Sequence, residues 1–339
     1  MQVLITGVAG FIGANAADQL LTQGHKVFGL DNLNNYYDPS LKNARLKNLS
    51  KTHNSFKFKR ANIQEPGILK EILKNNSIDV VIHLAAQAGV RYSIENPRVF
   101  LESNVVGTFE LLEAARNNPP KHMLLASTSS AYGANTDIPY CETQKADHQI
   151  SFYAATKKAT EEMAHSYAHL YQLPITIFRF FTVYGPWGRP DMAPMKFAKR
   201  ILNGYPLDVY NHGFMKRDFT YVDDLVHALN LLLDKAPGKT PISMAFDSLS
   251  PVAPFRIVNI GNNRPIELKD FIAALEQEIG LKAVQNFMDM QPGDVLTTWA
   301  DTRLLQALTG YSPTTDLSKG IKSFVEWYLD YYRDGLSVK

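Results

Sequence analysis

The stretch 4-LITGVAGFIG-13 connects an apolar run to a helical pattern through three glycines, Gly7, Gly10 and Gly13. Residues 2–6 (QVLIT) favour a strand, and residues 11–21 have the apolar periodicity of a helix. Glycines between a strand and a helix let backbone N–H groups approach a phosphate at the helix N-terminus. The spacing G-x-x-G-x-x-G is a variant of the dinucleotide-binding pattern, and taken alone it also fits simple tight packing.

A carboxylate follows where the dinucleotide pattern requires one. The next predicted strand, KVFGLD at 26–31, ends at Asp31, whose carboxylate can accept hydrogen bonds from ribose hydroxyls. An acid here repels a 2′-phosphate, so the sequence predicts NAD rather than NADP; a turn-capping acid is the alternative. The neighbouring residues complete this part of the predicted cofactor site: Phe11, Ile12 and Asn32.

Strands and helices alternate through the first half of the chain. Further strands are predicted at 56–63, 79–86, 121–127 and 175–181, and helices at 42–49, 66–74, 97–116 and 153–171. This alternation predicts an α/β fold with a doubly wound parallel sheet of the Rossmann type. We expect residues 1–182 to form the NAD-binding domain. Residues 183–339 should form mainly a smaller α/β lobe for the substrate, with some later segments returning to the first domain.

The carboxyl ends of later strands should complete the cofactor pocket. Asn62 and Ile63 are predicted to contact the adenine, and the small residues of HLAAQAG should lie against the cofactor: Leu84, Ala85 and Ala86. His83 lies within an apolar run and is interpreted as a hydrogen-bonded core histidine. His165 and His169 share a helix face, but no third ligand accompanies them, so we predict no metal site.

Two side chains four residues apart suggest the chemistry. FYAATKKA places Tyr153 and Lys157 on one face of a helix. A lysine ammonium ~4 Å from a phenol lowers the phenol pKa by about three units at an effective dielectric near 20. Such a pair makes a general base for an alcohol. Tyrosine and lysine at this spacing are common, so the pair alone is weak evidence.

The combination resembles the extended short-chain dehydrogenase/reductase superfamily, and the resemblance covers essentially the whole chain. It rests on the glycine turn, on the hydroxyl cluster of ASTSSAYG (126–133) after the fifth strand, and on Y-x-x-x-K opening the next helix. The resemblance implies that Thr128 hydrogen-bonds the reacting oxygen and that Tyr153 transfers its proton. It also implies that Lys157 lowers the tyrosine pKa and holds the nicotinamide ribose. The resemblance further places Phe181 near the nicotinamide and gives Asn104 a role in the geometry of its helix.

Longer segments resemble UDP-glucuronate 4-epimerases, namely DNLNNYYDPSLK, HLAAQAGVRYS, FFTVYGPWGRPDMA, KRDFTYVDD and QPGD. This resemblance implies a tightly bound NAD that is regenerated in each cycle and a homodimer formed through helices 100–116 and 153–171. The chain departs from the pattern in three places. Asn62 stands where many relatives have Asp, Ala131 replaces a more usual Val, and Gln291 stands where galactose epimerases have a diphosphate-binding arginine.

The resemblance also implies a substrate site. Its expected members are Arg91, Thr128, Ser129, Ser130, Thr182, Arg189, Arg217 and Asp294. The hydroxyls are expected to hold the uronate carboxylate and Arg189 to close the loop over the site, while Arg217 and Arg91 should pair with the diphosphate. Related dehydratases carry Asp-Glu where this chain has Ser129-Ser130, and glucuronate decarboxylases carry Glu at the second position. The alternatives are that the serines only cap the turn and that Arg217 is a solvated charge.

Composition limits the other possibilities. The chain has 339 residues with 35 basic and 33 acidic side chains and no block of like charge, so we expect no nucleic-acid or membrane partner. A single cysteine, Cys141, suits a reducing cytoplasm, and the glycine-interrupted N-terminal run does not resemble a signal peptide. Three alternatives to a uronate epimerase remain open. They are a 4-epimerase of a neutral UDP-hexose or UDP-N-acetylhexosamine, a glucuronate decarboxylase, and a non-catalytic dinucleotide-binding protein.

Overall fold

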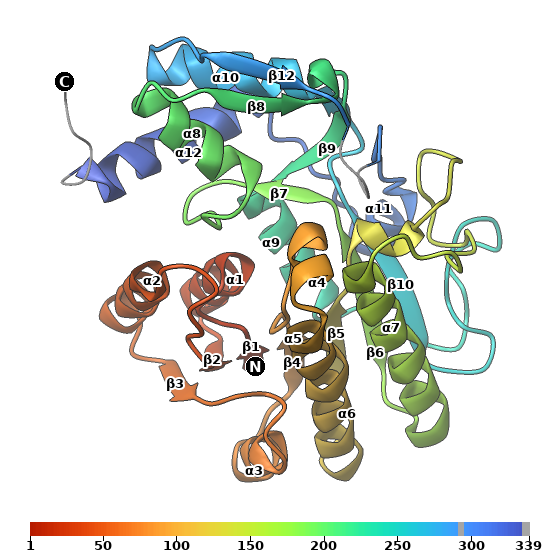
Figure 1. Ribbon diagram of the computed structural model, residues 1–339. Helices are drawn as coiled ribbons and strands as arrows, with labels where there is room; N and C mark the ends of the chain where they lie inside the picture. The colour runs from red at the N-terminus through yellow and green to blue at the C-terminus, as the bar shows by residue number, and fades with distance from the viewer. Residues whose placement is uncertain (291–294, 334–339) are drawn as a thin grey trace.

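A seven-stranded parallel sheet forms the centre of the molecule in the computed structural model, which describes residues 1–290 and 295–333 (Figure 1). Its strand order is β10-β6-β5-β4-β1-β2-β3. The strands are β1 (Gln2–Thr6), β2 (Lys26–Asp31), β3 (Phe56–Arg60), β4 (Val80–His83), β5 (His122–Ala126), β6 (Ile175–Phe180) and β10 (Phe255–Ile260). The predicted parallel, doubly wound sheet is confirmed.

Alternating side chains of the strands enter two separate hydrophobic cores. In β1, Val3 and Ile5 belong to one core while Leu4 belongs to the other, and all three are fully buried. The first core is covered by α1 (Phe11–Thr22), α2 (Pro39–Thr52) and α9 (Val222–Leu232), and the second by α3 (Ile68–Asn75), α6 (Gly107–Asn117) and α7 (Phe152–Tyr171). Burial on both faces explains why the central strands β1, β4 and β5 are apolar almost throughout.

The strand order reverses next to β1. β2 pairs with one edge of β1 and β4 with the other, in parallel register from Gln2↔Lys26 and Val3↔Val80. The connections that leave the carboxyl ends of β1 and β4 therefore diverge to opposite sides, which opens a crevice between them.

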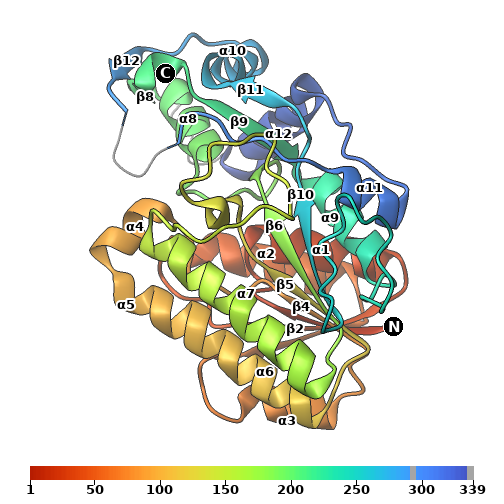
Figure 2. The ribbon, with the colours of Figure 1, turned by 90° about the vertical axis from the view of Figure 1, so that its right-hand side faces the viewer.

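A second lobe lies at the end of the molecule opposite α3 and α6 (Figures 1 and 2). It contains a three-stranded sheet of β11 (Pro265–Glu267), β9 (Lys216–Tyr221) and β7 (Thr182–Tyr184), and a two-stranded sheet of β12 (Gln285–Met288) and β8 (Leu207–Tyr210). Its helices are α8 (Ala193–Leu202), α10 (Leu268–Ile279) and α12 (Leu317–Tyr331), while α11 (Arg303–Thr309) packs against β10 and α9.

Several shorter elements were not predicted. The segment expected as one helix at 97–116 is divided into α5 (Pro97–Phe100), a π-helical turn η1 (Leu101–Val106) and α6, and it is preceded by α4 (Val90–Glu95). Strand β10 pairs with β6 from Phe255↔Ile175, so the central sheet takes a strand from far beyond residue 182. Within the described ranges, no helix is long and apolar enough to cross a membrane.

Candidate active site

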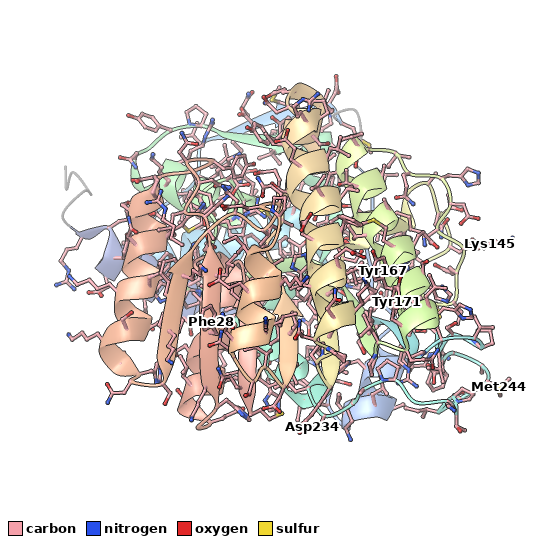
Figure 3. The ribbon with its side chains drawn as sticks, turned by 90° about the horizontal axis from the view of Figure 1, so that it is seen from below. Phe28, Lys145, Tyr167, Tyr171, Asp234 and Met244 are labelled. Atoms are coloured by element: carbon pink, nitrogen blue, oxygen red, sulfur yellow. The ribbon has the colours of Figure 1, made fainter. Side chains whose placement is uncertain are left out.

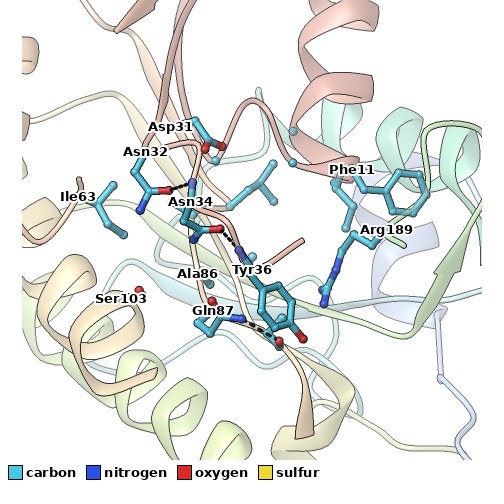
Figure 4. A pocket seen from close by; sticks show the side chains of 18 of the residues that line it. Phe11, Asp31, Asn32, Asn34, Tyr36, Ile63, Ala86, Gln87, Ser103 and Arg189 are labelled. Carbon is cyan, nitrogen blue, oxygen red and sulfur yellow. Dashed lines mark hydrogen bonds between the residues drawn. The ribbon is translucent and has the colours of Figure 1, made fainter. Parts of the chain in front are cut away.

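A cavity opens where the carboxyl ends of β1, β2, β4 and β5 meet, and it holds about 1130 Å³ of empty space, part of it open to solvent (Figure 4). Many of the predicted site residues line it, namely Gly7, Gly10, Phe11, Ile12, Gly13, Asp31, Asn32, Ile63, Leu84, Ala85, Ala86, Tyr153, Lys157 and Arg189. The structure thus brings residues from several strand ends, from α1 and α7 and from the loop after β7 together around one cavity.

The glycine turn fits a dinucleotide. Gly7 has φ of 75°, and a Cβ there would lie 2.7 Å from the backbone nitrogen of Ala85. A Cβ on Gly13 would lie 2.2 Å from the carbonyl oxygen of Gly7. Both positions therefore require glycine, and the turn leaves its backbone uncovered at the N-terminus of α1, where a pyrophosphate would bind.

Asp31 joins the end of β2 to the same turn. Its carboxylate accepts hydrogen bonds from the N–H groups of Ala9 at 3.1 Å and Leu33 at 2.8 Å. Burial raises the pKa of this carboxyl group, and these hydrogen bonds act in the opposite direction. A carboxylate offers about four acceptor positions, so two backbone donors leave acceptor positions for ribose hydroxyls.

Three predicted cofactor residues do not line the cavity. Asn62 is exposed, and its side-chain oxygen accepts a 2.9 Å hydrogen bond from Asn32. Asn104 is buried and binds both the N–H and the carbonyl of Gln87, which does line the cavity. Phe181 packs in a separate cluster with Tyr132 and Tyr140, and its neighbour Phe180 faces the cavity instead.

Tyr153 lies in the first turn of α7 and lines the cavity. Burial raises the pKa of its phenol, while a hydrogen bond from Thr128 and the charge of Arg189 act to lower it. The sequence assigned this lowering to Lys157. Thr128 and Arg189 were not expected in this role, and the loop after β7 brings the guanidinium of Arg189 to the same end of the cavity.

Lys157 is buried one helical turn further along α7 and lines the cavity floor. Burial lowers the pKa of its ammonium group to about 8, and the carboxylate of Glu161 opposes that effect. The nearby His83 is a core residue, as predicted. Its two ring nitrogens lie 2.7 Å from the hydroxyl of Thr6 and 3.1 Å from that of Thr108, and burial lowers its pKa to about 3.

The hydroxyl cluster after β5 divides into different environments. Ser127 lines the cavity and donates a 2.5 Å hydrogen bond to Glu161. Thr128 caps the short 3-10 turn Ser129–Tyr132 by accepting a 3.2 Å hydrogen bond from the N–H of Ser130. Ser129, Ser130 and Thr182 are partly exposed near this point and do not line the cavity. Thr128 therefore combines the capping role with its contact to Tyr153.

The predicted diphosphate ligands lie away from the cavity. The exposed Arg91, at the start of α4, has its guanidinium carbon 4.5 Å from the ring centre of Tyr210 in β8. Arg217 in β9 donates to the carbonyls of Lys216 and Leu296 at 2.9 and 3.2 Å. Asp294 and Gln291 lie outside the described residues.

Several cavity residues were missed by the sequence analysis. They are Asn34, Tyr36, Tyr37, Lys42, Gln64, Gln87, Ala88, Ser103, Ser127 and Phe180. Half of them follow β2 or β4 by a few residues, so for these the position just beyond the carboxyl end of a strand was the available signal. Figure 4 shows Tyr36 and Arg189 beside each other, with Asn32 and Ile63 at the other end of the cavity.

Known proteins share this architecture. A model of the NAD dependent epimerase/dehydratase family matches residues 3–245. The chain is 49% identical over 336 residues to a probable UDP-glucuronate 4-epimerase of Rhizobium meliloti, covering 98% of both chains. It is 46% identical over 335 residues to UDP-glucuronate 4-epimerase 4 of Arabidopsis thaliana, covering 97% of this chain and 76% of that protein. The structure also resembles a UDP-glucuronic acid 4-epimerase from Bacillus cereus in complex with UDP-glucuronic acid and NAD, with a TM-score of 0.86, 32% identity and coverage of 98% of this chain and all of that one.

Proposed function

The chain belongs to the NAD dependent epimerase/dehydratase family, and on that basis we propose that it is an isomerase that interconverts UDP-glucuronate and UDP-galacturonate. The observation that carries the proposal is the meeting of Tyr153, Thr128 and Arg189 at one end of a cavity whose other end fits a dinucleotide. The family and the relatives named above support NAD as the cofactor.

The cofactor residues would hold NAD across the cavity, with the glycine turn at its pyrophosphate and Asp31 at a ribose. When bound, NAD would supply the redox chemistry, as acceptor and donor of the hydride at C4 of the sugar. We assign the proton to Tyr153, which as phenolate takes it from the 4-hydroxyl and gives it back after the 4-keto sugar has turned over. Thr128 holds the same oxygen, and Lys157 keeps a positive charge beneath the site.

The uronate creates a second requirement. Its 4-keto form is a β-keto acid, and the C5–C6 bond of such an acid can break to release CO₂. The electron pair of that bond then enters the C4–C5 enolate, and a proton later adds at C5. An epimerase must hold the carboxylate near the carbonyl plane to prevent this. Hydrogen bonds to a carboxylate contribute roughly 1.5–3 kcal/mol each, so two or three suppress the loss by orders of magnitude.

We assign this holding to the donors of the 126–133 segment and of the loop after β7, namely Thr128, Ser129, Ser130, Thr182 and Arg189. The acids that dehydratases and decarboxylases carry at 129 and 130 are replaced by serines, which supports epimerisation over both rival reactions. Arg91, Arg217 and Asp294 are assigned to the UDP part of the substrate.

We propose that the protein is a homodimer. Apolar side chains stand exposed along η1, α6 and α7, including Leu101 (43%), Phe109 (42%) and Leu170 (64%). Figure 3 shows α6 and α7 side by side, with Tyr167 and Tyr171 labelled on α7. A row of exposed apolar residues on two adjacent helices is typical of a helix-pair interface.

A chain with a single cysteine suits the reducing cytoplasm, where we expect the enzyme to act.

The test is to incubate the protein with NAD and UDP-glucuronate and to follow the sugar protons by NMR. Formation of UDP-galacturonate without CO₂ supports the proposal, and Tyr153→Phe should abolish turnover while NAD still binds. Formation of a UDP-pentose with CO₂ would identify a decarboxylase. Turnover of UDP-glucose or UDP-N-acetylglucosamine in place of UDP-glucuronate would identify an epimerase of neutral sugars.

A further inference from the structure

Arg189 is held by a neighbour in its own loop. Its Nε and Nη2 atoms donate to the two carboxylate oxygens of Asp191 at 3.1 and 2.5 Å, and both side chains are about one-fifth exposed. A guanidinium bound on this edge has a fixed plane, because two parallel hydrogen bonds define it. The Nη1 edge has no hydrogen-bond partner among the described residues, so it can donate into the cavity.

Asp191 is in turn held by a residue from a distant part of the chain. The hydroxyl of Tyr36 donates to Oδ2 of Asp191 at 3.2 Å. Burial, together with the nearby charge of Asp191, raises the pKa of Tyr36 to about 12, so this phenol stays protonated and remains a donor. Although burial acts to raise it, the pKa of Asp191 is lowered overall by Arg189, so the carboxylate stays ionised.

Tyr36 has a fixed position of its own. Its ring packs against Tyr92 with ring centres 4.7 Å apart, and Tyr92 packs against Phe100 at 5.9 Å. Phe100 then meets the ring of Tyr153 edge-on at 5.9 Å. The connection after β2 that carries Tyr36 is tied to α2 by Lys42, whose ammonium donates to the backbone and side-chain oxygens of Asn34 at 2.8 and 2.7 Å.

The backbone that carries Arg189 is fixed from the other side. Arg45 of α2 donates to the carbonyls of Trp187 and Gly188 and to that of Ala9 in the glycine turn, at 2.5, 3.1 and 2.9 Å. The segment beside the cofactor ribose and the loop beside the sugar are therefore joined twice, by Arg45 through the backbone and by Tyr36 through Asp191.

From this arrangement we infer that Tyr36 and Asp191 are positioning residues, which fix the guanidinium of Arg189 so that its Nη1 edge meets the uronate carboxylate at the sugar end of the cavity. The inference rests on the proposed function and extends it. If Asp191 is replaced by a neutral residue and Tyr36 by one that cannot donate a hydrogen bond, the guanidinium samples several rotamers. The carboxylate of the 4-keto sugar is then free to leave the carbonyl plane. Retention of the carboxyl group then depends on residues that do not touch the sugar.

The experiment compares Asp191→Asn and Tyr36→Phe with the wild type in the full chain with NAD and UDP-glucuronate. The amount of CO₂ released per UDP-galacturonate formed should rise roughly tenfold or more in Asp191→Asn, because one charge-assisted hydrogen bond contributes about that factor. It should rise less in Tyr36→Phe. In an Arg189→Ala background, Asp191→Asn should change this ratio less than about twofold, because its effect passes through Arg189. A purely structural effect of Asp191→Asn would instead add to that of Arg189→Ala.

The matched control is Asp301→Asn. Asp301 also binds an arginine two residues away through both carboxylate oxygens, with Arg303 Nε 3.1 Å from Oδ1 and Nη2 2.6 Å from Oδ2, but it lies just before α11. It should leave the product ratio unchanged. An unchanged ratio in both Asp191→Asn and Tyr36→Phe, with an active wild type, overturns the inference and leaves the proposed function standing.

A binding measurement tests the inference without turnover. Calorimetry on NAD-loaded protein carrying Tyr153→Phe should show that Asp191→Asn weakens UDP-glucuronate binding roughly tenfold and UDP-glucose binding much less. Equal weakening of both sugars overturns the inference. A wild type that binds UDP-glucuronate and does not epimerise it contradicts the proposed function alone, and this selective loss of uronate affinity then still supports the positioning role.

Discussion

The hydroxyl of Ser127 donates a 2.5 Å hydrogen bond to the carboxylate of Glu161, and both side chains are almost fully buried. Arg179 of β6 binds the same carboxylate through Nε and Nη2 at 3.0 and 2.7 Å. The end of β5, the middle of α7 and the neighbouring strand are thus joined by one buried charge pair directly behind the catalytic end of the cavity.

Glu161→Gln should destabilise the fold strongly. It leaves the Arg179 guanidinium buried without a counter-charge, which typically costs about 3–5 kcal/mol in the free energy of unfolding. Guanidinium-chloride unfolding monitored by circular dichroism would measure it. Lys158→Ala is the control, because Lys158 meets the same carboxylate at 3.3 Å from a more exposed position and should cost less than about 1 kcal/mol. Comparable losses of unfolding free energy in the two variants would show that the Arg179–Glu161 pair contributes no more to stability than the contact with Lys158.

Asp31→Asn should weaken discrimination between NAD and NADP. The amide can still accept from one backbone N–H, but it no longer repels a 2′-phosphate and is a weaker acceptor for ribose hydroxyls. We expect the ratio of the two dissociation constants to change roughly tenfold or more, as measured by calorimetry. Asp38→Asn is the matched control, since Asp38 is an exposed N-cap in the same connection and asparagine caps equally well. A ratio that stays constant in Asp31→Asn would assign Asp31 to turn capping alone.

How far the sequence predicted the site depended on how local each feature is. The glycine turn and Asp31 belong to one β-turn-α-β unit, and Tyr153 and Lys157 to one helix, so spacing alone brought each set together. Tyr36 and Asp191 are 155 positions apart, and nothing in either segment indicates that they meet. Their contact depends on how the loop after β7 folds back over the strand ends, which is a property of the whole tertiary structure.

Other details that the sequence did not show have similar causes. Phe180 and Phe181 are adjacent at the end of β6, and which of them faces the cavity depends on where the strand stops alternating. The electrostatic partner of Tyr153 was sought one helical turn away, at Lys157, whereas Arg189 approaches from another lobe of the molecule. Strand β10 was missed because its run, FRIVNI, follows a long Pro- and Ser-rich connection and carries an arginine and an asparagine that find buried partners only in the folded chain.

Acid should destabilise the protein partly through His83. Its pKa in the folded state is lowered to about 3 by burial, below the ordinary value of 6.5, so between these values the unfolded chain binds a proton that the folded chain does not. The stability that this neutral histidine contributes is complete above pH 6.5 and is lost as the pH falls toward 3, with a slope of up to about 1.4 kcal/mol per pH unit.

The His83→Gln variant tests this assignment. Glutamine can still bond to Thr6 and Thr108 but does not titrate, so its unfolding free energy should fall less steeply than that of the wild type between pH 6.5 and 4.5, when both are measured by urea unfolding. His148→Gln serves as the control, because His148 is exposed and its replacement leaves the buried core unchanged. Identical slopes in wild type and His83→Gln would remove His83 from the acid response.

Phe109→Glu should convert the proposed dimer to monomers. Phe109 is 42% exposed on α6, and burying a glutamate against its symmetry mate would cost several kcal/mol of desolvation and repulsion while leaving the monomer's own cores intact. Sedimentation velocity would measure the change in mass. Tyr205→Glu is the control, because Tyr205 is an equally prominent aromatic residue, 60% exposed, in the other lobe, and it should leave the assembly unchanged. A wild type that sediments as a monomer, or a Phe109→Glu variant that stays dimeric, would place the contact elsewhere or remove it.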